Sequence, residues 1–224
     1  MDLPADIEEA LALAGGNRRE LKAVLRHYRQ DSLKFRAACF LIANMRWHYS
    51  DDSGYCLYSD AKDSDLCDLR RFDRSFLISH VDHAFDVWES SPCAAGLSFC
   101  EFCEYILPYR SLAGYPDCFS GAELYDLFGK YVGAGQGDSL AGYVARYNRV
   151  KTDFEGVTGK RSALDSSLYR PFFPGRECTD VAVIGCQILR ACGKADAHPR
   201  LERLRLLFRH VQPRPVVRPL CVHG

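Results

Sequence analysis

The chain has no net charge, because 29 Lys and Arg residues balance 29 Asp and Glu residues among its 224 positions. A neutral chain produces no overall field that attracts nucleic acid or an anionic membrane, so neither is expected as a partner. No apolar run reaches the length that crosses a bilayer, and no transmembrane segment is expected. Met1 leads directly into DLPADIEEA, so no signal peptide is expected. An exported protein that has lost its leader would begin in the same way, and localisation stays open.

Several catalytic motifs are also missing. The sequence contains neither Gly-x-Ser-x-Gly nor His-Glu-x-x-His, the motifs of serine hydrolases and zinc proteases. The stretch GVTGKRS ends like a phosphate-binding loop, but Phe154 stands where that loop requires its first glycine. The stretch GAGQGDS follows no apolar strand and is a weak dinucleotide fingerprint. No cofactor is therefore expected.

Cysteine, by contrast, is abundant. The eleven cysteines are odd in number and dispersed, unlike the dense, even set of a small secreted scaffold, so most are expected to be reduced and structural. Zinc would suit the residue types of His80, His83, Cys93, Cys100 and Cys103. However, Cys103 falls on an apolar helical stripe, whereas zinc Cys-x-x-Cys pairs usually occupy a tight turn. No metal is expected, and the two histidines are expected to be solvated.

The spacing of apolar residues predicts a mainly α protein that begins with short amphipathic helices. Asn17 and Glu20 have the spacing of a capping box, as do Ser98 and Glu101, and Asp31 is expected to cap another helix. Residues 46–71 form a long polar loop. Its four aromatic residues either line a binding surface or pack onto the helices: Trp47, Tyr49, Tyr55 and Tyr58.

The stretch PGRECTDVAVIGCQILRACG contains the candidate catalytic residue. Apolar residues recur at helical spacing from Cys178 to Cys192, including Ile188 and Leu189, and Gly193 is expected to end this helix. A cysteine at a helix start lies near unpaired N–H groups and the positive end of the helix dipole, which favour a thiolate. The alternative is that Cys178 is an inert buried thiol.

The same stretch resembles the nucleophile helix of transglutaminase-like proteins. In that superfamily a Gly-x-Cys-x-Asp opening precedes a helix that ends in Leu-Arg-Ala-x-Gly. Cys178, Asp180 and residues 189–193 match, although two residues rather than one separate Gly175 from the cysteine. The stretches LKAVLRHYRQDSLKFRAACFLIANM and LSFCEFCEYILPYRS are similar to the helical N-terminal part of transglutaminase-like proteins from Bacteroidetes.

The resemblance implies that Cys178 is a nucleophile that attacks an amide or ester carbonyl of a protein, peptide or glycopeptide substrate. It also implies three regions: a helical N-terminal region at 1–130, the start of a papain-like α+β core at 131–193 with nucleophile helix 178–192, and a basic tail at 194–224. Most of the core's sheet is expected to be missing. No histidine or aspartate after residue 193 matches the family's catalytic partners, so the chain is expected to be inactive as written, through truncation or a frame shift. The alternative is a non-catalytic helical interaction module in which Cys178 is structural.

Overall fold

The computed structural model describes residues 3–49, 67–92, 94–110, 119–129 and 186–193. These residues are mostly helical and include no strand; a single antiparallel bridge joins Tyr49 to Cys67. The prediction of a mainly α protein is confirmed for this part of the chain. Cys178, most of residues 131–193 and the whole tail at 194–224 lie outside the described residues, as do Tyr55 and Tyr58.

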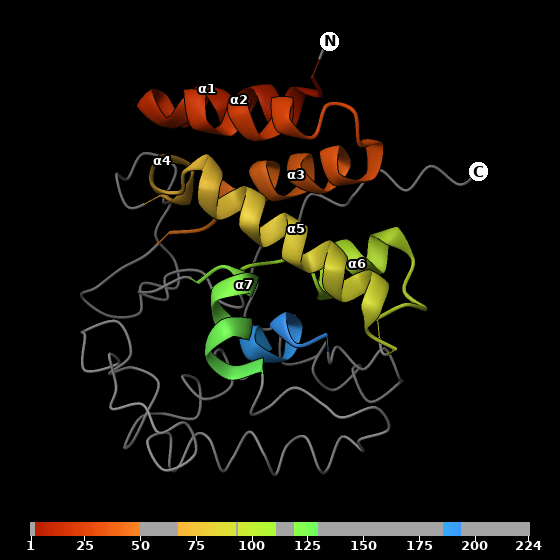
Figure 1. Cartoon of the computed structure of the whole chain (residues 1–224). Coiled ribbons are helices and arrows are strands. Elements are labelled where there is room, and N and C mark those ends of the chain that lie inside the picture. Colours follow the sequence, from red (N-terminus) through yellow and green to blue (C-terminus); the bar gives the residue numbers. More distant parts are fainter. Residues whose placement is uncertain (1–2, 50–66, 93, 111–118, 130–185, 194–224) are drawn as a thin grey trace, which may run out of the picture.

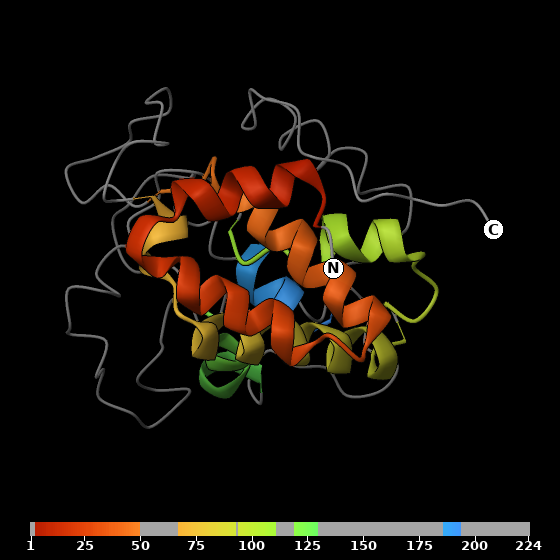
Figure 2. The ribbon, with the colours of Figure 1, turned by 90° about the horizontal axis from the view of Figure 1, so that it is seen from above.

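The N-terminal helices form two layers. Helices α1 (Ala5–Leu13) and α2 (Arg18–His27) lie side by side in the outer layer, joined by a 3-10 turn at Gly15–Asn17 (Figure 1, Figure 2). Helix α3 (Ser32–Met45) packs beneath both of them and against α5 (Arg74–Ser90), and α4 (Asp68–Arg71) closes one end. Apolar residues at helical spacing fill the space between the layers, among them Ile7, Leu11, Leu21, Val24, Ile42, Met45, Leu77 and Val81.

A second group of short helices packs on the other side of α5. It comprises α6 (Phe99–Tyr105), α7 (Gly121–Leu124), a π-helical turn at Tyr125–Gly129 and a helix at 186–191 (Figure 1). The rings of Trp88 and Phe102 stack with centroids 4.4 Å apart, and Phe85 meets Phe102 edge-on at 4.8 Å. These aromatic contacts join α5 to α6 and extend the core of the first group.

Two of the three predicted helix caps are confirmed. The Asp31 carboxylate accepts hydrogen bonds from the backbone N–H groups of Leu33 and Lys34, at 3.1 and 3.0 Å. Ser98 and Glu101 form both halves of a capping box at the start of α6. Each cap satisfies backbone donors that the first helical turn leaves unpaired.

The capping box predicted at Asn17 and Glu20 is wrong. Asn17 has helical backbone angles (φ −78°, ψ −6°) because it closes the 3-10 turn, whereas a capping side chain requires an extended backbone. Its amide instead donates to the carbonyl oxygens of Leu69 and Phe72, at 2.9 and 2.8 Å. Glu20 pairs with Arg74 at 3.4 Å. Both side chains thus connect α2 to the α4–α5 corner.

The two described aromatic residues of the predicted loop differ in exposure. Tyr49 is buried and Trp47 is half-buried, and the chain after Cys67 forms the short helix α4. Packing onto the helices is therefore the correct alternative for Tyr49.

Candidate functional site

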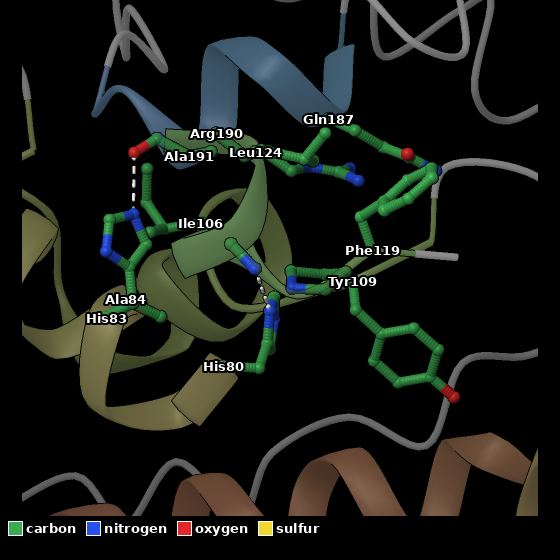
Figure 3. Close-up of a pocket in the computed structure, with 12 residues that line it drawn as sticks. His80, His83, Ala84, Ile106, Tyr109, Phe119, Leu124, Gln187, Arg190 and Ala191 are labelled. Carbon is green, nitrogen blue, oxygen red and sulfur yellow. Dashed lines mark hydrogen bonds between the residues drawn. The ribbon is translucent and has the colours of Figure 1, made fainter. Parts of the chain in front are cut away.

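A small cavity lies where α5, the end of α6, α7 and helix 186–191 meet (Figure 3). It is partly open to the surface and has room for about one water molecule. Its polar side chains come from three separate parts of the sequence, and the lining includes His80, His83, Tyr109, Phe119, Gln187 and Arg190. A space of this size does not accept a substrate side chain, so the cavity marks a junction between helices.

His80 is buried, so the prediction that it is solvated is wrong. Its side chain is 4% exposed, and both ring nitrogens have backbone partners. Nδ1 accepts from the Gly121 N–H at 2.8 Å (Figure 3). Nε2 donates to the Leu107 carbonyl at 2.6 Å. Burial lowers the pKa of His80 to about 4, so the ring is neutral at pH 7. Its position three residues after Leu77, on the apolar stripe of α5, is the sequence signal that indicates burial.

His83 occupies the next turn of α5 and is half-buried. Its Nε2 donates to the Ala191 carbonyl at 2.8 Å, so the side chain joins α5 to helix 186–191 (Figure 3). Gly121 passes close to it: a Cβ there would lie 2.8 Å from His83 Cδ2. The absence of a side chain at position 121 lets α7 approach both histidines.

The two histidines do not converge with Cys100 and Cys103, the cysteines considered for zinc that the structure describes. Cys103 is a buried free thiol on α6, and Cys100 is disulfide-bonded. Within the described residues no group of three or more His, Cys, Asp or Glu side chains is placed to hold a metal ion. Cys93 lies outside those residues. That no metal binds stays a prediction.

Helix 186–191 is attached to the rest of the fold through its last turn. Arg190 donates from Nε to the Tyr105 carbonyl at 3.1 Å and from Nη1 to the Arg110 carbonyl at 3.0 Å. Gly193 has φ of 65°, which confirms the predicted helix end, and its carbonyl accepts from Ser91 Oγ. A Cβ on Gly193 would lie 2.6 Å from Ser91 Cβ, so the position also requires glycine for space.

A buried ion pair lies next to this junction. Asp68 and Arg110 are 0% and 1% exposed at their side chains, and Arg110 donates to the carboxylate through Nε and Nη2 at 2.5 and 2.8 Å. The Tyr109 hydroxyl donates to the same carboxylate at 3.1 Å. His48 Nδ1 lies 3.3 Å from that hydroxyl, and burial lowers the pKa of His48 to about 4. Sequence reasoning missed this network because no local pattern links residues 42 positions apart.

Gln187 is the least satisfied polar side chain of the junction. It is 3% exposed, and neither Nε2 nor Oε1 has a hydrogen-bond partner among the residues that the structure describes. The predicted inward face of this helix is confirmed for Ile188 and Cys192, whereas Leu189 is half-buried. The periodicity did not indicate that Gln187 is buried, because a polar residue is normally assigned to the solvent face.

The described cysteines on this helix are poor nucleophiles. Cys186 is half-buried, and burial raises the pKa of its thiol. Cys192 is buried at the helix end. Both therefore serve as comparison thiols for Cys178.

No protein-family model, no curated protein and no solved structure matches this chain. Among the described helices, none is long and apolar enough to cross a membrane.

Proposed function

We propose that the chain derives from a transglutaminase-like thiol enzyme and that Cys178 is its nucleophile. One observation carries the proposal: two stretches that resemble the family, Cys103–Arg110 and Leu189–Gly193, lie together in space. Arg190 of the second stretch donates to the carbonyls of Tyr105 and Arg110 of the first, across 80 or more residues of sequence. Such a contact is expected if both stretches belong to one site-supporting unit.

The attachment of helix 186–191 supports the proposed chemistry. Its last turn is held by bonds from Arg190 and His83, which restrict the direction of the helix axis. Nucleophilic catalysis requires such restriction, because small displacements of the reacting atom are costly. The thiolate would attack an amide or ester carbonyl and expel the amine or alcohol, giving a thioester that water or another amine then resolves.

The papain-like α+β core and the protein, peptide or glycopeptide substrate belong to the same proposal. The proposal also includes that the chain, with the sequence given, is catalytically inactive. His198, His210 and His223 do not match the position of the family's histidine, and the carboxylates of Glu177 and Asp180 oppose thiolate formation. Without a general base, the reaction rate would fall by a factor of about 10²–10⁴.

The proposal is tested by alkylation of the folded protein with iodoacetamide. Cys178 should be labelled faster than Cys186 and Cys192, as measured by peptide mass spectrometry over time. Equal or slower labelling of Cys178 would contradict the nucleophile assignment and favour the second candidate, a non-catalytic helical module. The continuous hydrophobic core that α1, α2, α3, α5 and α6 share favours that second candidate.

Turnover is measured separately, with amide and activated-ester substrates. We expect the full chain and a Cys178→Ala variant to give the same background rate. A turnover rate of the full chain above that of the Cys178→Ala variant would show that one of the three tail histidines completes the site. The proposal that the chain is inactive would then be wrong.

A further inference from the structure

Helix α2 carries a row of four exposed cations on the outside of the molecule. Arg19, Lys22 and Arg26 lie at i, i+3 and i+7, and Arg29 follows in the turn after the helix. We call these four residues the basic stripe. It lies away from the buried face of α2, in the outer layer of helices (Figure 1), and its helical part, from Arg19 to Arg26, spans about 10 Å at 1.5 Å per residue.

The residues of the stripe have no carboxylate partner, although many described cations do. Within the described part of the chain, none of its four residues forms an ion pair, and Arg26 bonds only to the Lys22 backbone carbonyl at 3.3 Å. Five other described cations form ion pairs: Arg18 with Glu8, Lys34 with Asp82, Arg46 with Glu9, Arg74 with Glu20, and Arg110 with Asp68. Arg71 is a single exposed cation on α4 and lies in no such row.

This arrangement destabilises α2 in the free protein. Lys22 and Arg26 are like charges at i and i+4, and Arg19 and Lys22 are like charges at i and i+3, so each pair repels. Arg19 also lies in the first turn, where the helix dipole disfavours a cation. A bound polyanion would reverse all three effects.

We propose that the basic stripe binds an acidic segment of a protein partner. The neighbouring helix α1 contains no cation, and its exposed Glu8 and Glu9 are paired with Arg18 and Arg46. The unpaired positive charge is therefore confined to one narrow row, which fits a linear polyanion better than a broad anionic surface such as a membrane. Single-stranded nucleic acid is usually bound with aromatic side chains that stack on bases. The exposed large apolar residues of the described part are Leu33 and Tyr125, and neither lies on α2.

Three of the four stripe residues are arginines, whose planar guanidinium groups can bond carboxylates in bidentate geometry. A partner helix with Glu or Asp at i, i+3 or i+4, and i+7 would place its carboxylates at the same spacing as the stripe. This inference is independent of the role of Cys178.

The test is fluorescence anisotropy of a fluorescein-labelled poly-glutamate peptide with the full chain at low and physiological salt. Lys22→Glu should weaken binding by about tenfold or more, and Arg71→Glu, which makes the same charge change at an exposed position on α4, by about twofold or less. The affinity of the original protein should fall as salt increases.

Thermal unfolding provides a second readout. Lys22→Glu should raise Tm, because the new carboxylate precedes Arg26 by four residues and replaces a repulsive pair with an attractive one. Lys22→Gln should also weaken peptide binding, although its neutral side chain forms no attractive pair with Arg26. Three outcomes would overturn the inference: no binding of poly-glutamate, equal weakening by Arg71→Glu, or tighter Lys22-dependent binding of RNA or phosphatidylserine vesicles.

Discussion

Two buried polar side chains of this protein differ in whether they have hydrogen-bond partners. Asp68 has its charge matched by Arg110 and receives a further bond from Tyr109. Gln187 is also buried, but its amide has no partner within the described part of the chain. A buried group without a hydrogen bond costs its desolvation free energy, whereas a buried charge that loses its partner costs considerably more. Substitutions at the two positions should therefore change stability in opposite directions.

Gln187→Met should stabilise the protein. The substitution keeps the length of the side chain and removes two unpaired polar atoms, so the free energy of unfolding should increase by about 1 kcal/mol. This corresponds to a rise in Tm of about 2–4 °C. Gln187→Glu is the control and should lower Tm, because it buries a charge. A lower Tm for Gln187→Met would mean that an ordered water pairs with the amide.

Asp68→Asn should destabilise the protein by about 3–5 kcal/mol, because it leaves the Arg110 guanidinium buried without a counter-charge. Urea unfolding gives the value. Glu8→Gln is the matched control: it breaks an ion pair whose side chains are 49% and 42% exposed and should cost less than about 1 kcal/mol. Similar losses for the two variants would show that the Asp68 pair is not the source of stability.

At the scale of helices, the sequence predicts what depends on neighbouring residues. The caps at Asp31 and Ser98 and the glycine end at Gly193 each need only three or four adjacent residues, and all three are observed. Asn17 has the same local pattern, but the preceding 3-10 turn sets its backbone angles and distant carbonyls take its side chain.

The candidate site was less predictable for the same reason. Burial of His80 depends on the chain after α6 and on α7, whose contacting residues lie 27 and 41 positions away. The carbonyl oxygens that accept hydrogen bonds from Arg190 lie 80 or more residues before it. No periodicity within one helix contains such information.

Gly193→Ala should destabilise the attachment of helix 186–191. The positive φ alone costs an alanine about 1–2 kcal/mol, and the Cβ would also lie 2.6 Å from Ser91 Cβ. Gly16→Ala is the comparison, because a Cβ there meets no atom within 4 Å and φ is not positive. It should leave stability unchanged or raise it by up to about 1 kcal/mol. Equal effects on urea unfolding would contradict the predicted difference.

For the whole molecule, two neutral histidines make stability depend on pH. Burial lowers the pKa of both His80 and His48 to about 4, below the value of about 6.5 in an unfolded chain. Between these values the unfolded state binds protons that the folded state does not. Stability should therefore decrease as pH falls from about 6.5 to 4 and be insensitive to these groups above that window.

When the pH falls from 7 to 5, protonation of His80 in the unfolded state should lower the free energy of unfolding by about 2 kcal/mol. His48 is half-buried, so its contribution should be smaller. Urea unfolding at both pH values measures the sum. A His80→Gln variant should lose most of the difference, even though its stability at pH 7 is lower. An unchanged difference would show that His80 does not titrate as its burial implies.

The attachment of helix 186–191 has a consequence for the order in which the protein is made. Its partners are His83, Ser91, Tyr105 and Arg110, and all of them leave the ribosome before residue 186 is synthesised. Domains generally fold from the N-terminus during synthesis. The two-layer unit of α1, α2, α3 and α5 can therefore form first, and the late helix then docks on a surface that already exists. Slow translation between residues 130 and 186 would favour correct docking.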